Sequence, residues 1–258
     1  MLIGILSDVH EDIARLQEAL KVFEDKKVEK IICLGDFVGF AAPYYSHFRT
    51  RDSNKVIELL KDKCDILLLG NHDLFAISKT PEKITEFDYL QNWYKLDYPT
   101  QKKLSDDKVW LYQEDELCSL ISDSNKNYLT SLPEHLIKDY GNCKILFSHY
   151  AFPDPTGSLK WEVTEPSQLR EHFEFMKQND CLYGFSGHDH AEGIKIFTED
   201  SVKLLPFDEK YRLPNMPAWL HIPSVANGTF KNGVVIFDTN NIEVEAISLN
   251  TPVHKKTI

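Results

Sequence analysis

Leu2-Ile3-Gly4-Ile5-Leu6-Ser7-Asp8-Val9-His10 is an apolar run that ends, after one serine, in an aspartate and a histidine. A run of this length and composition predicts a buried strand. Asp8 and His10 are then expected just beyond the carboxyl end of that strand. In open α/β sheets this edge is where ligands bind, so the stretch predicts both a fold class and the place of a site.

The same pattern occurs four more times along the chain. Apolar runs at 30–34, 65–69, 143–147 and 181–185 are followed by Gly35-Asp36, Gly70-Asn71-His72-Asp73, His149 and Gly187-His188-Asp189-His190. Five predicted strands would thus bring Asp, Asn and His side chains into one crevice. Carboxylate, amide and imidazole groups are together typical of a metal site that lacks thiolate ligands.

The order of the elements predicts parallel strands in the first part of the chain. Helical spacing of apolar residues predicts a helix through Glu24 with Asp12 as its cap, and a second helix capped by Ser53. Residues 1–73 therefore form an expected βαβαβ unit.

The rest of the chain shows other sequence patterns than this alternation of strands and helices. Residues 74–140 contain aromatic-rich helical pieces whose order the sequence does not reveal. From Gly193 onward, two hairpins are expected, at 194–197 with 202–205 and at 234–237 with 242–246.

Length and composition favour a single domain over residues 1–258. No apolar stretch is long enough for a bilayer, and the run at Met1 lacks a basic leading region, so we expect a cytoplasmic protein without a membrane partner. The five cysteines include no Cys-x-x-Cys and are expected to be free, mostly buried thiols. The net charge of −11 argues against long nucleic acids as partners, although it counts Asp8 and Asp36 without bound cations.

Together the five segments resemble the calcineurin-like metallophosphoesterase family, which carries Asp-x-His, Gly-Asp-x-x-Gly, Gly-Asn-His-Asp, an isolated His and Gly-His-x-His in this order. The resemblance covers residues 2–190 and the β-rich stretch that follows. It implies an α/β fold, a four-layer α/β/β/α sandwich with two sheets face to face. We expect the first sheet to supply the ligands.

The resemblance also implies two divalent ions and the residues that hold them. One ion would bind Asp8, His10, Asp36 and His190, and the other Asp36, Asn71, His149 and His188, with Asp36 as the bridge. This donor set suits Mn²⁺, which we expect, or Fe or Zn. The expected reaction is hydrolysis of a small-molecule or nucleotide phosphoester, diester or monoester, by a hydroxide shared between the ions, with His72 as the acid.

Departures from the family pattern keep two alternatives open. Serine/threonine protein phosphatases carry Gly-Asp-x-Val-Asp-Arg-Gly, whose second Asp steadies the acid histidine and whose Arg grips phosphate. This chain instead has Gly35-Asp36-Phe37-Val38-Gly39-Phe40, which looks more like the small prokaryotic phosphodiesterase branch. That branch tends to end its site with Asn-Pro-Gly-Ser-Val-Gly, matched only in part by His221-Ile222-Pro223-Ser224-Val225-Ala226.

A protein phosphatase is therefore one alternative. The other is an inactive scaffold that docks proteins, which the complete set of ligand residues disfavours because clustered polar groups need ions or partners.

Several polar residues are expected to have structural roles. Asp73 either orients His72 or bonds backbone amides, and Asp189 is expected to be a solvated loop residue. The loop from Tyr44 to Arg51 packs its own aromatics, or else stacks a base and clamps a phosphate. Surface or packing positions are expected for His47, His135, His172, His221 and His254. Substrate specificity should reside in segments 40–52, 74–140 and 150–168, whereas oligomeric state stays open.

Overall fold

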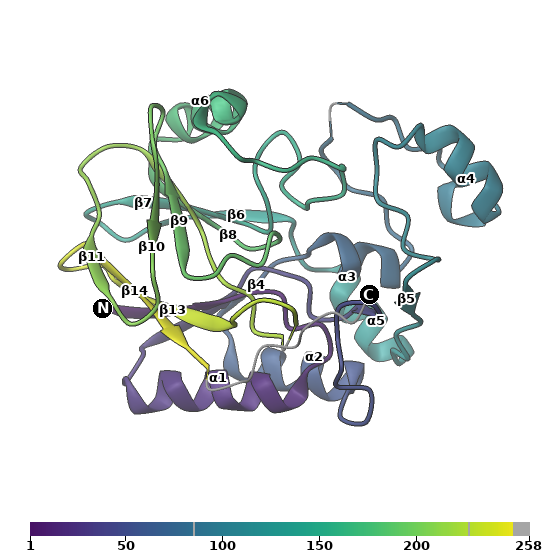
Figure 1. Ribbon diagram of the computed structural model, residues 1–258, viewed down its shortest axis with the longest axis horizontal. Helices are drawn as coiled ribbons and strands as arrows, with labels where there is room; N and C mark the ends of the chain where they lie inside the picture. The colour runs from purple at the N-terminus through teal and green to yellow at the C-terminus, as the bar shows by residue number, and fades with distance from the viewer. Residues whose placement is uncertain (85, 227, 250–258) are drawn as a thin grey trace.

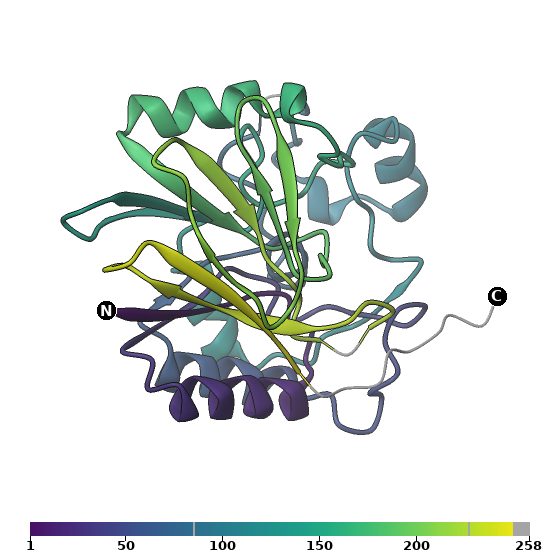
Figure 2. The ribbon, with the colours of Figure 1, turned by 60° about the vertical axis from the view of Figure 1, so that its left-hand side comes forward.

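The computed structural model describes residues 1–84, 86–226 and 228–249, so His254 lies outside the described residues. Two six-stranded sheets lie face to face, with helices on both outer faces (Figures 1 and 2). Helices α1 (Ile13–Asp25) and α2 (Ser53–Lys63) cover one face, and α6 (Arg170–Gln178) covers the other. The expected four-layer α/β/β/α sandwich is confirmed.

The first sheet has the strand order β11-β14-β13-β1-β2-β4. Its strands are β1 (Leu2–Leu6), β2 (Lys30–Cys33), β4 (Ile66–Leu67), β11 (Lys210–Arg212), β13 (Gly233–Asp238) and β14 (Glu243–Ser248). Strands β1, β2 and β4 are parallel, which confirms the βαβαβ unit, and β13 pairs antiparallel with both β1 and β14. The expected hairpin of β13 and β14 is therefore also confirmed.

The second sheet has the order β10-β9-β12-β8-β7-β6. Its strands are β6 (His135–Asp139), β7 (Lys144–Ser148), β8 (Cys181–Ser186), β9 (Ile194–Phe197), β10 (Val202–Leu205) and β12 (Ala218–His221). The β9–β10 hairpin is as expected, whereas β6 lies within residues 74–140, for which no order of elements is predicted. Strands β7, β8 and β12 run parallel to one another, so β7 and β8 end at the same edge of the sheet.

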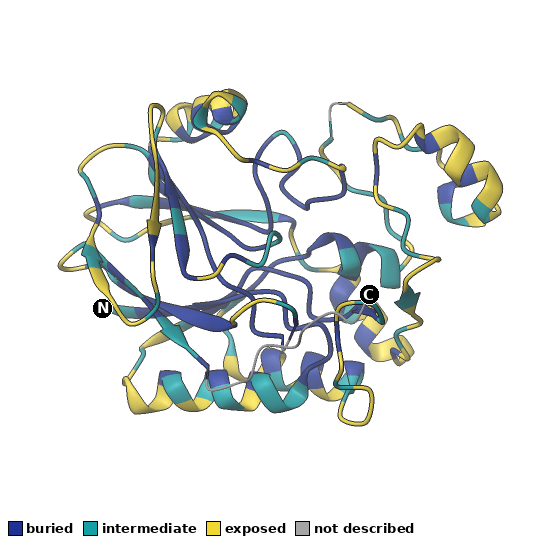
Figure 3. Cartoon of the chain, viewed as in Figure 1, coloured by how far each residue is buried: buried dark blue, intermediate teal, exposed yellow. Residues whose placement is uncertain are grey.

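Three apolar layers hold the sandwich together, and the central strands of both sheets are buried, whereas the edge strands β6, β10 and β11 are partly exposed (Figure 3). Between the sheets, Ile3 and Ile5 of β1 lie in one cluster with Phe147 and Phe185. Helices α1 and α2 pack residues such as Phe23 on the outer face of the first sheet, and α6 packs Met176 on that of the second. Each such buried side chain contributes about 1.5–3 kcal/mol, so the sheet edges are held firmly in register.

The middle of the chain is an irregular segment at one end of the sandwich. It contains α3 (Asn71–Ala76), the 3₁₀ turn η1 (Trp93–Lys95), α4 (Tyr98–Ser105), β5 (Glu116–Leu117) and α5 (Asp123–Thr130), and a further 3₁₀ turn, η2 (Pro166–Leu169), precedes α6. Strand β5 pairs antiparallel with the short strand β3 (Phe40–Ala41), so two distant segments meet beside the loop after β2.

The structure corrects one expected helix cap, confirms the buried cysteines and leaves two predictions untested. The cap of α2 is Asp52 rather than Ser53, because the Asp52 side chain accepts the backbone N–H of Lys55 from an extended conformation. Cys33, Cys143 and Cys181 are buried free thiols, as expected, whereas Cys118 is exposed. Among the described residues, no helix combines the length and apolar character needed to cross a bilayer. The single domain and the cytoplasmic location stay predictions.

Candidate metal centre

The candidate ligands converge from both sheets, which corrects the expectation that the first sheet alone supplies them. Asp8, His10, Asp36 and Asn71 follow β1, β2 and β4 of the first sheet. His149 follows β7, and His188 and His190 follow β8, in the second sheet. The face-to-face packing brings the ends of these strands together, so one site can draw on both sheets.

The backbone at this site is unusual. Five of the seven candidate ligands have left-handed φ angles: Asp8 (57°), His10 (46°), Asp36 (55°), His188 (76°) and His190 (52°). Such conformations cost of order 1–3 kcal/mol each when they are strained, and they cluster where function constrains the chain. The strand exits therefore turn sharply, and the side chains point back toward one another.

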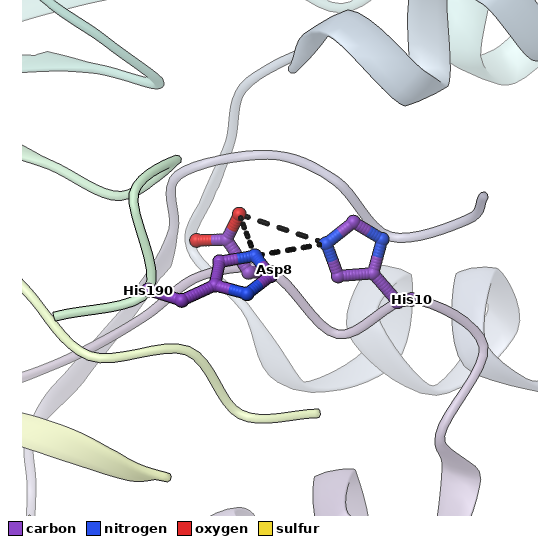
Figure 4. A group of neighbouring side chains, drawn as sticks. All are labelled: Asp8, His10 and His190. Atoms are coloured by element: carbon purple, nitrogen blue, oxygen red, sulfur yellow. Dashed lines mark hydrogen bonds and ion pairs between the residues drawn. The ribbon is translucent and has the colours of Figure 1, made fainter. Parts of the chain in front are cut away.

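Asp8, His10 and His190 form a first group (Figure 4). Asp8 Oδ1 lies 3.3 Å from His190 Nε2 and 3.7 Å from His10 Nε2, and the two Nε2 atoms lie 3.3 Å apart. His10 Nδ1 donates a hydrogen bond to the Gly39 carbonyl at 2.8 Å, which leaves the Nε2 lone pair free in the neutral ring. Asp8 Oδ1 is buried and has no hydrogen bond.

Asp36, His149 and His188 form a second group. His149 Nδ1 donates to the Leu34 carbonyl at 3.1 Å, and its buried Nε2, which has no hydrogen bond, lies 3.1 Å from Asp36 Oδ2. Asn71 adjoins this group, because its Oδ1 lies 3.1 Å from His188 Nδ1.

Asp36 lies between the two groups. Its Oδ1 accepts the backbone N–H of His72 at 2.9 Å. Its Oδ2 faces His149 of the second group at 3.1 Å and His10 of the first group at 3.9 Å. A carboxylate placed between two sets of nitrogen atoms has the position that a bridging ligand needs.

These atoms fit divalent metal ions. The buried Asp8 Oδ1 and His149 Nε2 have no hydrogen-bond partner, and His10 Nε2 lies 3.3 Å from another ring nitrogen, that of His190, so a cation here would interact favourably with all of these atoms. Oxygen and imidazole donors without a thiolate suit Mn, Fe or Zn in a non-structural site. The structure thus brings together all seven residues that the sequence singled out.

The charges of the site also favour a bound cation. Burial alone would raise the pKa of the Asp8 and Asp36 carboxyls, but the charge of His149 and the other histidines holds both well below the usual range. Burial would lower the pKa of His149, but Asp36 and Asp8 raise it to about 9. Two buried carboxylates therefore stay ionised and attract positive charge to this place.

Asp73 bonds backbone amides rather than orienting His72, so one of its two expected roles is confirmed. Its Oδ2 accepts the N–H of Asp36 at 2.7 Å and of Gly70 at 3.0 Å. Its Oδ1 accepts the N–H of Phe37 at 2.9 Å and of Val38 at 3.2 Å. One buried carboxylate thus fixes the loop after β2 to the loop after β4.

Glu116 orients His72, a contact that the sequence analysis missed. His72 Nδ1 lies 2.5 Å from Glu116 Oε2, and the Glu116 side chain is only 2% exposed. Burial would lower the pKa of His72, but Glu116 and Asp36 raise it to about 9. Glu116 therefore takes the place that the missing Asp of the protein phosphatase pattern would have filled.

Tyr112 is a second residue that the sequence did not indicate. Its hydroxyl accepts a hydrogen bond from Asn71 Nδ2 at 2.9 Å, which turns the Asn71 carbonyl oxygen toward His188. Its ring centroid lies 4.7 Å from that of His72. Tyr112 therefore helps to fix both consecutive residues of the Asn-His pair.

Asp189 is not the solvated loop residue that we expected. Its backbone N–H donates to His221 Nε2 at 3.0 Å, and its Oδ2 accepts a hydrogen bond from the Tyr150 hydroxyl at 3.3 Å. Burial is the main cause that raises the pKa of Asp189 to about 7. Asp189 is shielded from solvent because it forms hydrogen bonds with Tyr150 and His221, which are themselves buried.

Three other histidines have the packing roles that we expected. His172 is fully buried, its Nδ1 accepts the N–H of Phe152 at 3.0 Å, and burial lowers its pKa to about 3. His135 packs edge-on against Phe152, and His221 is buried beneath Asp189.

Part of the loop from Tyr44 to Arg51 packs against neighbouring aromatic side chains, which is one of the two roles expected for it. Phe40 contacts His47 and Phe48 at centroid distances of 4.8 Å. Arg51 pairs with Glu11 at 2.7 Å and stacks on Phe40, so it is not available as a phosphate clamp.

Comparison with known proteins agrees with this geometry. The family model described as calcineurin-like phosphoesterase matches residues 1–192, about three quarters of the chain. The chain belongs to the calcineurin-like phosphoesterase family. Its membership confirms the prediction of a metal-dependent phosphoesterase at the level of the family.

Similar proteins include an uncharacterized protein of Methanocaldococcus jannaschii, MJ0912. It is 24% identical over 98% of this chain and 89% of its own length. A stretch of 38 residues is 45% identical to phosphodiesterase MJ0936 of the same organism, covering 15% of this chain and 23% of that protein.

Solved structures with the same fold include a metallophosphoesterase from Sphaerobacter thermophilus, with a TM-score of 0.66 and 21% identity over 98% of this chain and 89% of that chain. Another is the hypothetical protein PH1004 from Pyrococcus horikoshii, with a TM-score of 0.58 and 14% identity. The match covers 97% of this chain and 88% of that chain.

The Asp73→Asn variant should be destabilised by about 3 kcal/mol, because an amide cannot accept from all four N–H groups and leaves buried donors unpaired. Urea unfolding of chelator-stripped protein would measure the change. Asp200→Asn, in the exposed turn between β9 and β10, is the control and should change stability by less than about 0.5 kcal/mol. Equal stability of Asp73→Asn and the control would show that this carboxylate does not hold the two loops together.

Proposed function

We propose that this phosphoesterase binds two divalent ions and hydrolyses a small-molecule or nucleotide phosphoester. Asp8, His10, Asp36 and His190 would hold one ion, and Asp36, Asn71, His149 and His188 the other. The observation that carries the proposal is the position of Asp36 between two groups of candidate ligand atoms. Mn²⁺ is the metal that we propose, with Fe or Zn as alternatives of similar chemistry.

When bound, the two ions would lower the pKa of a water molecule and polarise the phosphoryl group. The chain itself supplies the proton donor. His72 lines the cavity beside the candidate ligands, and Glu116 occupies its Nδ1, so Nε2 is the nitrogen that remains for the substrate. A histidine held in this way by a buried carboxylate is positioned to protonate the leaving oxygen.

The preference for a small phosphoester over a phosphoprotein rests on the cavity. Its volume is about 290 Å³, and no Arg or Lys is among the described residues that line it. The chain's net charge of −11 also favours a small substrate over a long nucleic acid. The short match to an archaeal phosphodiesterase favours a diester, whereas the presence of the whole ligand set disfavours an inactive scaffold.

The test uses chelator-stripped protein with Mn²⁺ restored and two substrates, bis-nitrophenyl phosphate and nitrophenyl phosphate. Wild type should bind two equivalents of Mn²⁺ and hydrolyse the diester faster. His72→Ala should bind the same two equivalents and lose about 10²–10⁴ in kcat, because only the acid is removed. Asp36→Asn should lose affinity for both ions. Metal content by elemental analysis and initial rates are the two measurements.

Each result that differs has a definite meaning. Wild-type turnover by His72→Ala would refute the acid assignment. Loss of only one ion in Asp36→Asn would refute the bridge. Faster hydrolysis of the monoester would make the protein a phosphatase, and no turnover with Mn²⁺, Fe²⁺ or Zn²⁺ would favour the scaffold.

Glu116→Gln should lower kcat by about tenfold or more, because a neutral amide holds His72 less firmly and stabilises its charge less. Mn²⁺ content and KM should stay the same, since Glu116 is not a proposed ligand. The matched control is Glu114→Gln, an exposed carboxylate two residues away that pairs with Lys102. A kcat equal to wild type would show that Glu116 does not position the acid.

A further inference from the structure

The cavity beside the candidate metal centre has a second part that the proposed chemistry does not use. Asp36, Asn71, His72, His188 and His190 line it at the candidate metal centre. Five aromatic side chains from three separate segments of the chain also line it, namely Tyr44, Tyr45, Trp110, Tyr112 and Phe230.

Three of these aromatic side chains are open to solvent. Tyr44 is 45% exposed, Trp110 is 43% exposed and Phe230 is 50% exposed. A single exposed aromatic residue needs no explanation, but three that border one concave site beside catalytic polar groups are typical of a ligand pocket. Aromatic faces of this kind bind flat rings by stacking, at about 1–3 kcal/mol per ring.

The charges of the pocket oppose a second phosphate. Asp115 and Glu116 are among its lining residues, although the Glu116 carboxylate pairs with His72, and the described lining residues include no Lys or Arg. The ammonium group of Lys160 lies 5.4 Å from the centre of the Trp110 ring, but it pairs with Asp107. A second phosphate on this side, away from the proposed metal ions, would lie near the exposed Asp115 with no lysine or arginine among the described lining residues.

We propose that this pocket binds a planar aromatic group attached to a single phosphate, with Trp110, Tyr44 and Phe230 as specificity-determining residues. The proposal rests on the proposed function, because the candidate metal centre would hold the phosphate itself. A nucleobase and a simple aryl group share the chemistry that the pocket recognises.

The experiment measures binding by calorimetry to the His72→Ala protein loaded with Mn²⁺, so that ligands are not hydrolysed. The probes are methyl phosphate, phenyl phosphate, AMP and ADP, with Mn²⁺ in excess. Phenyl phosphate or AMP should bind at least tenfold tighter than methyl phosphate, and ADP should bind no tighter than AMP. The comparison of AMP with phenyl phosphate separates a nucleobase from an aryl preference, and either supports the proposal.

Two further variants on the same background assign the effect to the pocket. Trp110→Ala should weaken the affinity for the aromatic ligand about tenfold and leave the affinity for methyl phosphate unchanged. Tyr44→Ala should have the same effect. Phe48→Ala is the matched control, because Phe48 is 53% exposed and packs against Phe40 without lining the cavity. Its ligand preference should equal that of the parent protein.

Equal affinities for methyl phosphate and for both aromatic ligands would overturn the proposal. An equal loss of affinity for all ligands in Trp110→Ala would also overturn it. Tighter binding of ADP than of AMP would overturn the limit to one phosphate. These failures leave the proposed function intact if the wild type still binds Mn²⁺ and hydrolyses the nitrophenyl diester. A protein that binds no Mn²⁺ and hydrolyses neither ester contradicts the proposed function, and this proposal with it.

Discussion

The carboxylate of Asp73 is the constraint on which the site depends. It accepts four backbone N–H groups, from Asp36, Phe37, Val38 and Gly70, in a place where it is fully buried. A buried carboxylate is tolerated only when its oxygens are satisfied in this way, so the two loops and the side chain stabilise one another. The result is that Asp36 is held in a left-handed conformation between two sets of imidazoles.

The close approach of the loops explains why Gly70 precedes the Asn-His pair. A Cβ atom at Gly70 would lie 2.1 Å from Asp36 Oδ1, so a side chain there would displace the proposed bridging carboxylate. The glycine is therefore required by the packing of the site and not only by the turn. The two sheets then fix the remaining ligands, because His149 and His188, which follow β7 and β8, lie against Asp8 and Asp36, which follow β1 and β2.

Chemistry and specificity come from different parts of the chain. The candidate ligands follow strands whose register is set by the buried core, whereas the aromatic side of the cavity comes from the β3 region, the segment before β5 and the loop before β13. Of the three segments that the sequence analysis assigned to specificity, 40–52 and 74–140 line the cavity. Residues 228–230 line it as well, and nothing in their sequence pointed to this.

The sequence predicted the features that local pattern controls. Most strands of the two sheets and all seven candidate ligands follow from apolar runs and the polar residues after them. Glu116 could not be found in this way, because it lies 44 residues from His72 and reaches it through the two-residue pairing of β3 with β5. The division of ligands between two sheets was also hidden, since a motif order does not show which strands pair. Strand β6 is half-exposed, so it lacks the buried apolar run that marks the other strands.

The central claim is that Asp36 joins two metal ions in one centre. Anomalous diffraction from crystals grown with Mn²⁺ tests it most directly. The account predicts two Mn²⁺ peaks about 3.5–4 Å apart, both bonded to the Asp36 carboxylate, one beside Asp8 and His190 and the other beside His149 and His188. A single peak, or two peaks of which one makes no bond to Asp36, would contradict it.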